Sequence, residues 1–497
     1  MSATASHLDS GEIGLRRGAI GLREVLFQSV TDMAPGAAIA ASIPAGAYFA
    51  GGALPLSVLL ALVACLLCAS CIAELSRELP SAGSLGTYTA RGLHPSLGFL
   101  VNWAYVAAAG LIPSLVLLQL GTTTAATVNE YAAGFSVNLW WIFTLAGALI
   151  VLLAGYYGIR TSTRMGTILG TFEIIIFVVL ALLFIIKAGQ ANTLDVFTSK
   201  YTPSGFRGLS GIFAGSVFTL LAFGGFEGAA PLAEEAKNPR KTIRRAVLGA
   251  TLGVGLIYVF TTYAASVAYG PTRFINFTSA GPASWEGIAT ASYGIFWLLV
   301  FLAIVNSCIA NSNAGVNVST RTAYAMGRIR IFPSFFSSVH PRHRTPQWGL
   351  LTAFIVTLGV AIGLGIHFNP FTAFAMVGTG IVVLLVAIYV VVNLACLGYF
   401  LRTRGRRVNW LLHVVVPILG VAALLPAWCS GAGVPIFSFI TPLPAPLSFM
   451  GPAMGAWMLV GIGYMVYLYR RHPERVVEVG TVHLDLEPEA EEEAAVA

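Results

Sequence analysis

Long apolar runs, separated by short segments rich in charged residues, Pro or Gly, make up most of this 497-residue chain. A helix needs roughly 20 apolar residues to cross a hydrocarbon layer of about 30 Å. The runs reach this length and predict an all-α integral membrane protein with twelve transmembrane helices, at residues 23–50, 54–76, 96–127, 138–158, 165–187, 209–232, 246–269, 291–319, 348–367, 371–399, 410–429 and 450–469. The polar first 20 residues contain no apolar core followed by a cleavage site, so we expect the first span itself to start insertion.

The composition agrees with a membrane protein. Hydrophobic residues make up 57% of the chain and charged residues only 10%, whereas a soluble domain carries about 25% charged residues. The net charge of +7 could suggest a nucleic-acid partner, but the basic residues are scattered between the apolar runs rather than gathered on one soluble domain. We therefore expect the lipid bilayer, and no nucleic acid, as a partner.

The distribution of Lys and Arg predicts the orientation. With both termini in the cytoplasm, 24 of the 28 basic residues fall on the cytoplasmic side, and four fall outside, namely Lys187, Lys200, Arg207 and Arg273. This is the bias of the positive-inside rule. We expect a plasma-membrane location, a cytoplasmic N-terminal segment at 1–20, and a disordered acidic cytoplasmic tail at 473–497, which has little to bury.

Helix-breaking residues interrupt two of the predicted spans. The first span reads TDMAPGAAIAASIPAG and contains Pro35-Gly36 and Pro44, and the sixth reads FTLLAFGGFEGAAPLAEE and contains Gly224-Gly225. A half-helix that begins inside the membrane offers N–H groups to a carboxylate, and one that ends there offers carbonyls to a cation. Such paired interruptions indicate the central site of a transporter, although Gly and Pro also cause merely structural kinks in membrane helices.

Four acidic residues are predicted at membrane depth, where an unpaired carboxylate costs a few kcal/mol. We interpret Glu74 as the partner of Arg77 in a structural ion pair. Glu173, in the fifth span, and Glu227, in the glycine-rich break, are candidates for coupling to an ion. Asp32 is a third coupling candidate, and a structural role is equally compatible with its place near the first break.

Other chemistry-bearing residues give weaker signals. Cys65, Cys68 and Cys71 have a metal-like spacing but lie in an apolar span, where cysteine serves as a small hydrophobe. The eight His residues are scattered, and no ring of pore-lining residues is evident. We therefore expect no metal, no cofactor and no enzymatic activity, and we rank a channel low.

The eighth predicted span has a broad polar side, which either forms hydrogen bonds with other helices or lines a pathway. This side consists of Asn306, Ser307, Asn311, Ser312, Asn313, Asn317 and Ser319.

Three segments resemble the amino acid–polyamine–organocation superfamily of permeases. They are AFGGFEGAAPLAEEAKNPRKTIRRA at the sixth span, AELSRELPSAGSLGTYTARGLHPSLGFLVNWAY between spans two and three, and NAGVNVSTRTAYAMGR at the end of span eight. The resemblance implies a LeuT-type fold. Its ten-helix transport core would occupy 21–400, as two inverted five-helix repeats at about 21–190 and 205–400, followed by two C-terminal helices within 408–470.

The resemblance also implies that substrate lies between the broken helices one and six. Carried over by position, the substrate-binding residues are Pro35, Gly36, Ala37, Ala38, Ile39, Phe223, Gly224, Gly225, Phe226 and Glu227. Phe223 or Phe226 could act as an aromatic gate or simply pack. Two departures stand out: Ala37 and Ala38 replace smaller residues of the usual pattern, and Glu173 stands where proton-driven relatives can carry a lysine.

Together these features predict a secondary transporter that moves amino acids by alternating access, coupled to H⁺ or working by exchange. Polyamines, other amines and nucleobases remain alternative small-molecule substrates. A polyamine site should contain additional acidic residues, and few are present. A channel or a membrane-embedded enzyme is a weaker alternative, and the oligomeric state stays open.

Overall fold

The computed structural model describes residues 18, 20–81, 83–131, 134–157, 162–277, 284–340, 345–402 and 408–480. These residues form helices and no sheet. Eleven of their helical segments are long and apolar enough to cross a membrane: α5 (Leu54–Glu78, preceded by Ala47–Ala53), α7 (Pro95–Tyr131), α8 (Trp140–Tyr157), α9 (Ser162–Ala188), α10 (Leu209–Phe223) with η8 (Phe226–Leu232), α11 (Pro239–Tyr269), α13 (Phe296–Arg328), α14 (Gln347–Phe368), α15 (Pro370–Arg402), α16 (Val416–Ala432) and α17 (Met450–Arg471).

The first of the twelve predicted spans is not among these eleven segments. Its residues form a series of short elements: α1 (Leu22–Met33), α2 (Pro35–Ala37), the π-helix η1 (Ala38–Ser42), α3 (Ile43–Ala45) and α4 (Ala47–Ala50). No single one is long enough to cross a bilayer, because helix geometry fails at Ala34 and changes again at residues 38–42. The interruption predicted here is confirmed.

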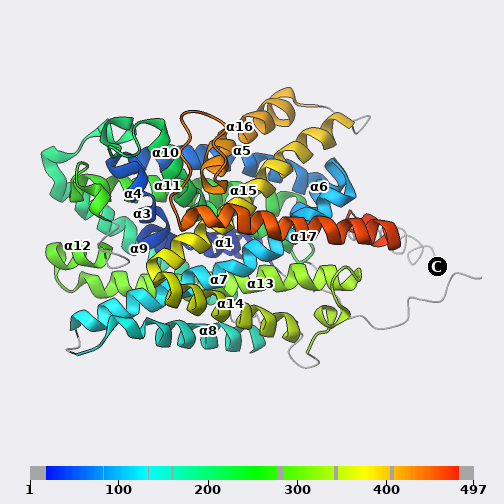
Figure 1. The fold of residues 1–497 in the computed structure, drawn as a ribbon, viewed down its shortest axis with the longest axis horizontal. Coiled ribbons are helices and arrows are strands. Elements are labelled where there is room, and N and C mark those ends of the chain that lie inside the picture. Colours follow the sequence, from blue (N-terminus) through cyan, green and yellow to red (C-terminus); the bar gives the residue numbers. More distant parts are fainter. Residues whose placement is uncertain are drawn as a thin grey trace, which may run out of the picture.

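Helices surround this interrupted segment on several sides. In Figure 1, α7, α8, α13, α14 and α17 run side by side, with α1 behind them near the middle of the molecule. α1 packs against α9, α11 and α13. The α10–η8 segment is 83% buried over its most apolar window, whereas α17 is 11% buried. The sixth predicted span is thus an inner segment, and α17 is a peripheral one.

Three short helices were not predicted: α6 (Ser84–Gly92), α12 (Ser284–Tyr293) and α18 (Pro473–Glu478). α18 corrects the predicted start of the disordered tail at 473. Val476 is buried, and Arg475 Nη1 donates a hydrogen bond to the carbonyl of Arg330 at 3.0 Å. Val479 is also buried, and Thr87 Oγ1 donates a hydrogen bond to its carbonyl at 3.1 Å. These contacts dock the chain as far as residue 480. Residues 481–497 of the predicted tail, and most of the predicted segment 1–20, lie outside the described residues.

Glu74 joins three elements at the end of α5. Its carboxylate lies 3.7 Å from Arg77 Nη1, as predicted, and 3.3 Å from Arg244 Nη2 of α11. His413 Nε2, in the π-helix η12 (Leu411–Val415), is 3.6 Å away. Glu74 is 6% exposed. The ion pair is therefore part of a larger polar junction that ties α5 to α11 and η12.

Candidate functional site

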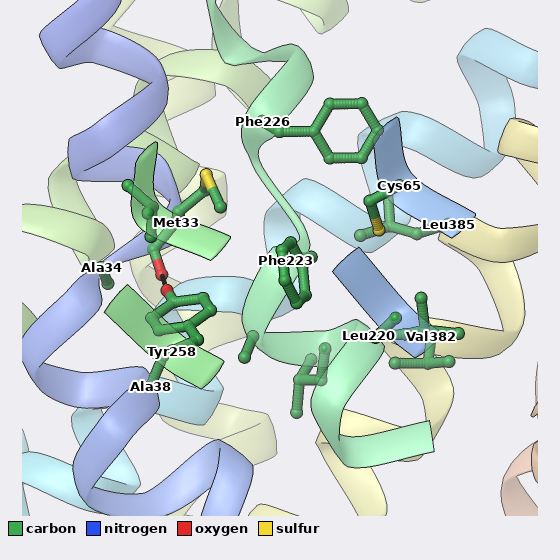
Figure 2. Close-up of a cluster of buried hydrophobic side chains, with 14 of the residues drawn as sticks. Met33, Ala34, Ala38, Cys65, Leu220, Phe223, Phe226, Tyr258, Val382 and Leu385 are labelled. Carbon is green, nitrogen blue, oxygen red and sulfur yellow. Dashed lines mark hydrogen bonds between the residues drawn. The ribbon is translucent and has the colours of Figure 1, made fainter. Parts of the chain in front are cut away.

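The break in the first span exposes carbonyl groups that side chains of other helices satisfy. Ala34 adopts a left-handed conformation, with φ of 46°, and ends α1. Tyr258 of α11 donates its hydroxyl to the carbonyl of Met33 at 2.7 Å, as Figure 2 shows. Asn311 of α13 donates to the carbonyl of Asp32, and Gln119 of α7 donates to that of Ala37 at 3.0 Å. Interrupted backbone inside a membrane needs such partners.

The break in the sixth predicted span lies between α10 and η8. α10 ends at Phe223, Gly224 is extended with ψ of 131°, and Gly225 has φ of +106°. Figure 2 shows the uncoiled link that carries the chain from Phe223 to Phe226. Both spans that the sequence marked as interrupted are therefore broken.

The two breaks lie against each other. Ser29 of α1 donates its hydroxyl to the carbonyl of Phe226 at 2.8 Å and accepts a hydrogen bond from the amide of Ala229 at 3.0 Å. A Cβ atom on Gly228 would lie 2.5 Å from Asp32 Oδ2. The end of α1 and the start of η8 thus form one polar junction, in which Gly228 leaves room for the Asp32 carboxyl.

A small cavity lies beside this junction. The centres of water molecules can occupy about 30 Å³ of it, which is room for about two waters. Of the predicted substrate contacts, Ala37, Ala38 and Gly224 line it. Asp32 also lines the cavity; it is 4% exposed, and its Oδ1 has no hydrogen-bond partner among the described residues.

Most of the cavity wall is apolar and was not anticipated. The added lining residues include Ile112, Leu115, Val116, Leu221, Ile381 and Leu385, from α7, α10 and α15. In the sequence these side chains are indistinguishable from those that face lipid, so no local signal could have identified them. Asn311, which belongs to the polar side of the eighth span, lines the cavity too.

The remaining predicted contacts do not line the cavity. They are Pro35, Gly36, Ile39, Phe223, Gly225, Phe226 and Glu227. Phe223 packs edge-on against Tyr258, with ring centroids 5.3 Å apart, and Phe226 packs against Tyr389 at 5.0 Å. Both phenylalanines are fully buried. In this conformation they pack in the core, and their substrate contacts stay predictions.

Glu227 is held at the start of η8. Its Oε2 accepts hydrogen bonds from the hydroxyl of Tyr389 at 2.8 Å and from the amide of Gly225 at 3.2 Å. The carboxyl also interacts electrostatically with Asp32. Among the described ion pairs, none includes Glu227. Glu227 therefore joins the glycine break to α15 while leaving two acidic groups close together.

Glu173 lies against the first break at Gly36. A Cβ on Gly36 would be 2.9 Å from Glu173 Oε2 and 3.0 Å from the Cβ of Ser307. Ser307 and Asn306 of α13 face the Glu173 carboxyl, whose Oε2 has no hydrogen-bond partner among the described residues. The polar side of the eighth span therefore faces the broken helix and Glu173.

Curated proteins with related sequences are transporters. The low-affinity putrescine importer PlaP of Escherichia coli (strain K12) is 24% identical over 383 residues, which cover 76% of this chain and 80% of the importer. The branched-chain amino acid permease BcaP of Bacillus subtilis (strain 168) is 26% identical over 366 residues, covering 70% of this chain and 75% of the permease. The mitochondrial cationic amino acid transporter 3 of Arabidopsis thaliana is 26% identical over 377 residues, covering 70% of this chain and 59% of the transporter.

A solved structure shares the fold. The crystal structure of a mutant manganese transporter from Eremococcus coleocola superposes with a TM-score of 0.54, covering 93% of this chain and 95% of that one at 14% sequence identity. The sequence model of the amino acid permease family matches residues 24–468. With this match over most of its length, the chain belongs to the amino acid permease family of the amino acid–polyamine–organocation superfamily.

Proposed function

We propose that this transporter carries an amino acid across the cell membrane by alternating access, with the substrate held between the two broken segments. The family and the relatives are transporters and not enzymes. The observation that supports the site is Asp32: a buried carboxyl at the junction of both breaks lines a cavity and has an oxygen without a partner. An ammonium group is a natural partner for such an oxygen.

The cavity wall favours a substrate with an aliphatic part. Leu115, Leu221 and Ile381 line the cavity together with the polar residues of the break. Hydrophobic walls with a few placed polar groups are typical of small-molecule sites. The substrate carboxylate would lie at the peptide N–H groups of the breaks, because no basic side chain lines the described cavity. Since about 30 Å³ is too little for an amino acid, binding requires the walls to move apart.

The proposed transporter would have the architecture expected from the sequence. The core at 21–400 would consist of two inverted repeats, with α16 and α17 as additional helices and both termini in the cytoplasm. The substrate would contact the predicted residues of both breaks as the walls separate. Glu227 would link occupancy of the site to gating, because it bonds both Gly225 and Tyr389.

An amine is the second candidate substrate. Asp32 supplies a counter-ion, and Glu227 is close enough to interact with it electrostatically, so a diamine could use both carboxyls. The Escherichia coli relative imports putrescine. Because such an amine has no carboxylate, the peptide N–H groups of the breaks would not be needed to bind it.

Uptake by purified protein in proteoliposomes tests the substrate. We expect saturable, competable uptake of leucine-like amino acids, with weaker competition by the matching alkyl amines, by putrescine and by adenine. Imposed proton and sodium gradients, applied separately, identify the driving ion. Uptake of amines alone would replace the amino acid proposal by the amine one, and ohmic single-channel currents would contradict a carrier.

We propose Glu173 as the group that carries or tunes the coupling proton, because its carboxyl lies against Gly36 at the first break. Glu173→Gln should retain exchange of labelled for unlabelled substrate but lose accumulation driven by a proton gradient, since the amide cannot bind and release a proton. Glu130→Gln, at the exposed end of α7, is the matched control and should behave as wild type. Full proton-driven accumulation by the Glu173→Gln variant would remove Glu173 from the coupling mechanism.

A further inference from the structure

A basic groove lies at the end of the helix bundle that the positive-inside rule assigns to the cytoplasm. It is formed by the end of α5 and the start of α11, and the centres of water molecules can occupy about 870 Å³ of it. Its lining contains five basic side chains, those of Arg77, Arg240, Lys241, Arg244 and Arg245, and one acidic side chain, that of Glu78. The groove shares no lining residue with the central cavity, and the transport mechanism does not use it.

Two of these basic groups are available to a ligand. Arg77 and Arg244 are partly neutralised by Glu74. Lys241 and Arg245 are exposed, and none of the described ion pairs includes either of them. They are four residues apart on α11 and therefore project from the same helix face. This face of the groove presents two unneutralised positive charges.

The same face of α11 becomes apolar within two turns. Leu252 is 47% exposed and Leu256 is 55% exposed. Gly249, just before Leu252, and Gly253, between the two leucines, are exposed, and a Cβ on Gly253 would meet nothing within 4 Å. Gly249 and Leu252 also line the groove itself. The groove thus runs from a basic opening onto an open apolar surface with two positions that lack side chains.

A phospholipid has the same order of groups as the groove, with a charged headgroup followed by apolar acyl chains. We propose that the groove binds an anionic phospholipid, with its phosphate at Lys241 and Arg245 and an acyl chain along Gly249, Leu252 and Gly253. Basic pockets at the cytoplasmic ends of membrane helices bind such headgroups. A soluble phosphate would use only the charged part of the groove and would leave the continuous apolar part without an occupant. The lipid would hold the start of α11, the helix whose Tyr258 supports the carbonyl of Met33.

Native mass spectrometry of the full chain in detergent can measure this binding with palmitoyl-oleoyl phosphatidylglycerol as the probe and the matching phosphatidylcholine for comparison. We expect phosphatidylglycerol to bind at least about tenfold more tightly than phosphatidylcholine. The Lys241→Gln/Arg245→Gln double variant should lose about 30-fold in affinity for phosphatidylglycerol, as expected for removal of two charges near a lipid surface. The matched control is Arg470→Gln/Arg471→Gln, which removes two exposed charges at the end of α17 and should change the affinity less than about twofold.

Other results would overturn the proposal in distinguishable ways. Equal losses in the two double variants would mean a general effect of net charge. Displacement of the lipid by glycerophosphoglycerol, the deacylated headgroup, at similar concentrations would identify a soluble phosphate as the ligand. A large gain in lipid affinity on deleting residues 481–497 would identify the acidic tail as the occupant in the intact chain. Because these measurements need no transported substrate, their outcome is independent of the proposed function.

Discussion

Replacing Glu227 by glutamine will give a protein that folds and binds substrate but whose transport is abolished or no longer follows pH. Glutamine has the same shape, and its amide oxygen can still accept the hydrogen bonds that Tyr389 and the amide of Gly225 donate to Glu227. It cannot carry a charge or exchange a proton. The change therefore removes the ionisable group at the sixth-span break while retaining the local hydrogen bonds. Uptake into proteoliposomes across a range of pH, together with equilibrium substrate binding, measures both properties.

Two further variants separate charge from shape at this position. Glu227→Asp keeps a carboxyl and should retain pH-dependent transport at a reduced rate, because the shorter side chain reaches Tyr389 less well. Tyr389→Phe removes one hydrogen bond to Glu227 and leaves the carboxyl in place, so its transport should also still respond to pH. Normal pH-dependent uptake by the Glu227→Gln variant would refute the role given to Glu227.

Gly225→Ala should be the most damaging small substitution at the site. Gly225 has φ of +106°, which disfavours any L side chain. Its added Cβ would lie 2.6 Å from the carbonyl carbon and 2.7 Å from the carbonyl oxygen of Asp32. These are backbone atoms at a position where Asn311 also bonds the carbonyl, so they have little room to move. Strain and overlap together should cost about 3–5 kcal/mol of stability, and transport should fall to background.

Gly253→Ala is the matched control for this substitution. Gly253 lies inside α11, faces outward, and a Cβ there meets nothing within 4 Å. Replacement of glycine by alanine inside a helix stabilises it by about 0.5–1 kcal/mol. Thermal unfolding of the purified proteins should therefore move in opposite directions for the two variants. A Gly225→Ala protein as stable and active as wild type would show that the two breaks do not need to touch.

The positions of the breaks could be read from the sequence because glycine and proline act locally. A proline removes a backbone donor, and a glycine tolerates positive φ, so Pro35 and Gly225 mark the breaks without knowledge of any neighbour. The partners of the breaks could not be read in this way. Tyr258 and Gln119 support carbonyls of the first segment, yet each lies in a long apolar helix and carries no local sign of that role. The same is true of the apolar cavity wall at Ile112 and Leu385.

For the acidic residues, too, the sequence predicted which residues matter, and tertiary packing decided what they contact. Their presence in apolar runs made Glu173, Glu227 and Asp32 candidates, because a carboxyl at membrane depth is expensive. Their individual environments depended on packing: Glu227 accepts hydrogen bonds across to α15, Glu173 faces α13, and Asp32 faces the cavity. Glu74 was correctly paired with Arg77, which lies one helical turn away, but its contacts with Arg244 and His413 come from distant segments.

The sequence by itself determined that this protein is a helical, multi-pass membrane protein of the permease type, and where its two inner segments break. Length, hydropathy and backbone breakers are properties of neighbouring residues, so they need no tertiary information. Only the tertiary structure decided that the breaks contact each other through Ser29, that Asp32 faces a cavity, and that a basic groove opens onto the apolar face of α11. These features depend on how helices far apart in the chain pack together, and hydrophobic side chains that face a cavity, a neighbouring helix or lipid look alike in a sequence.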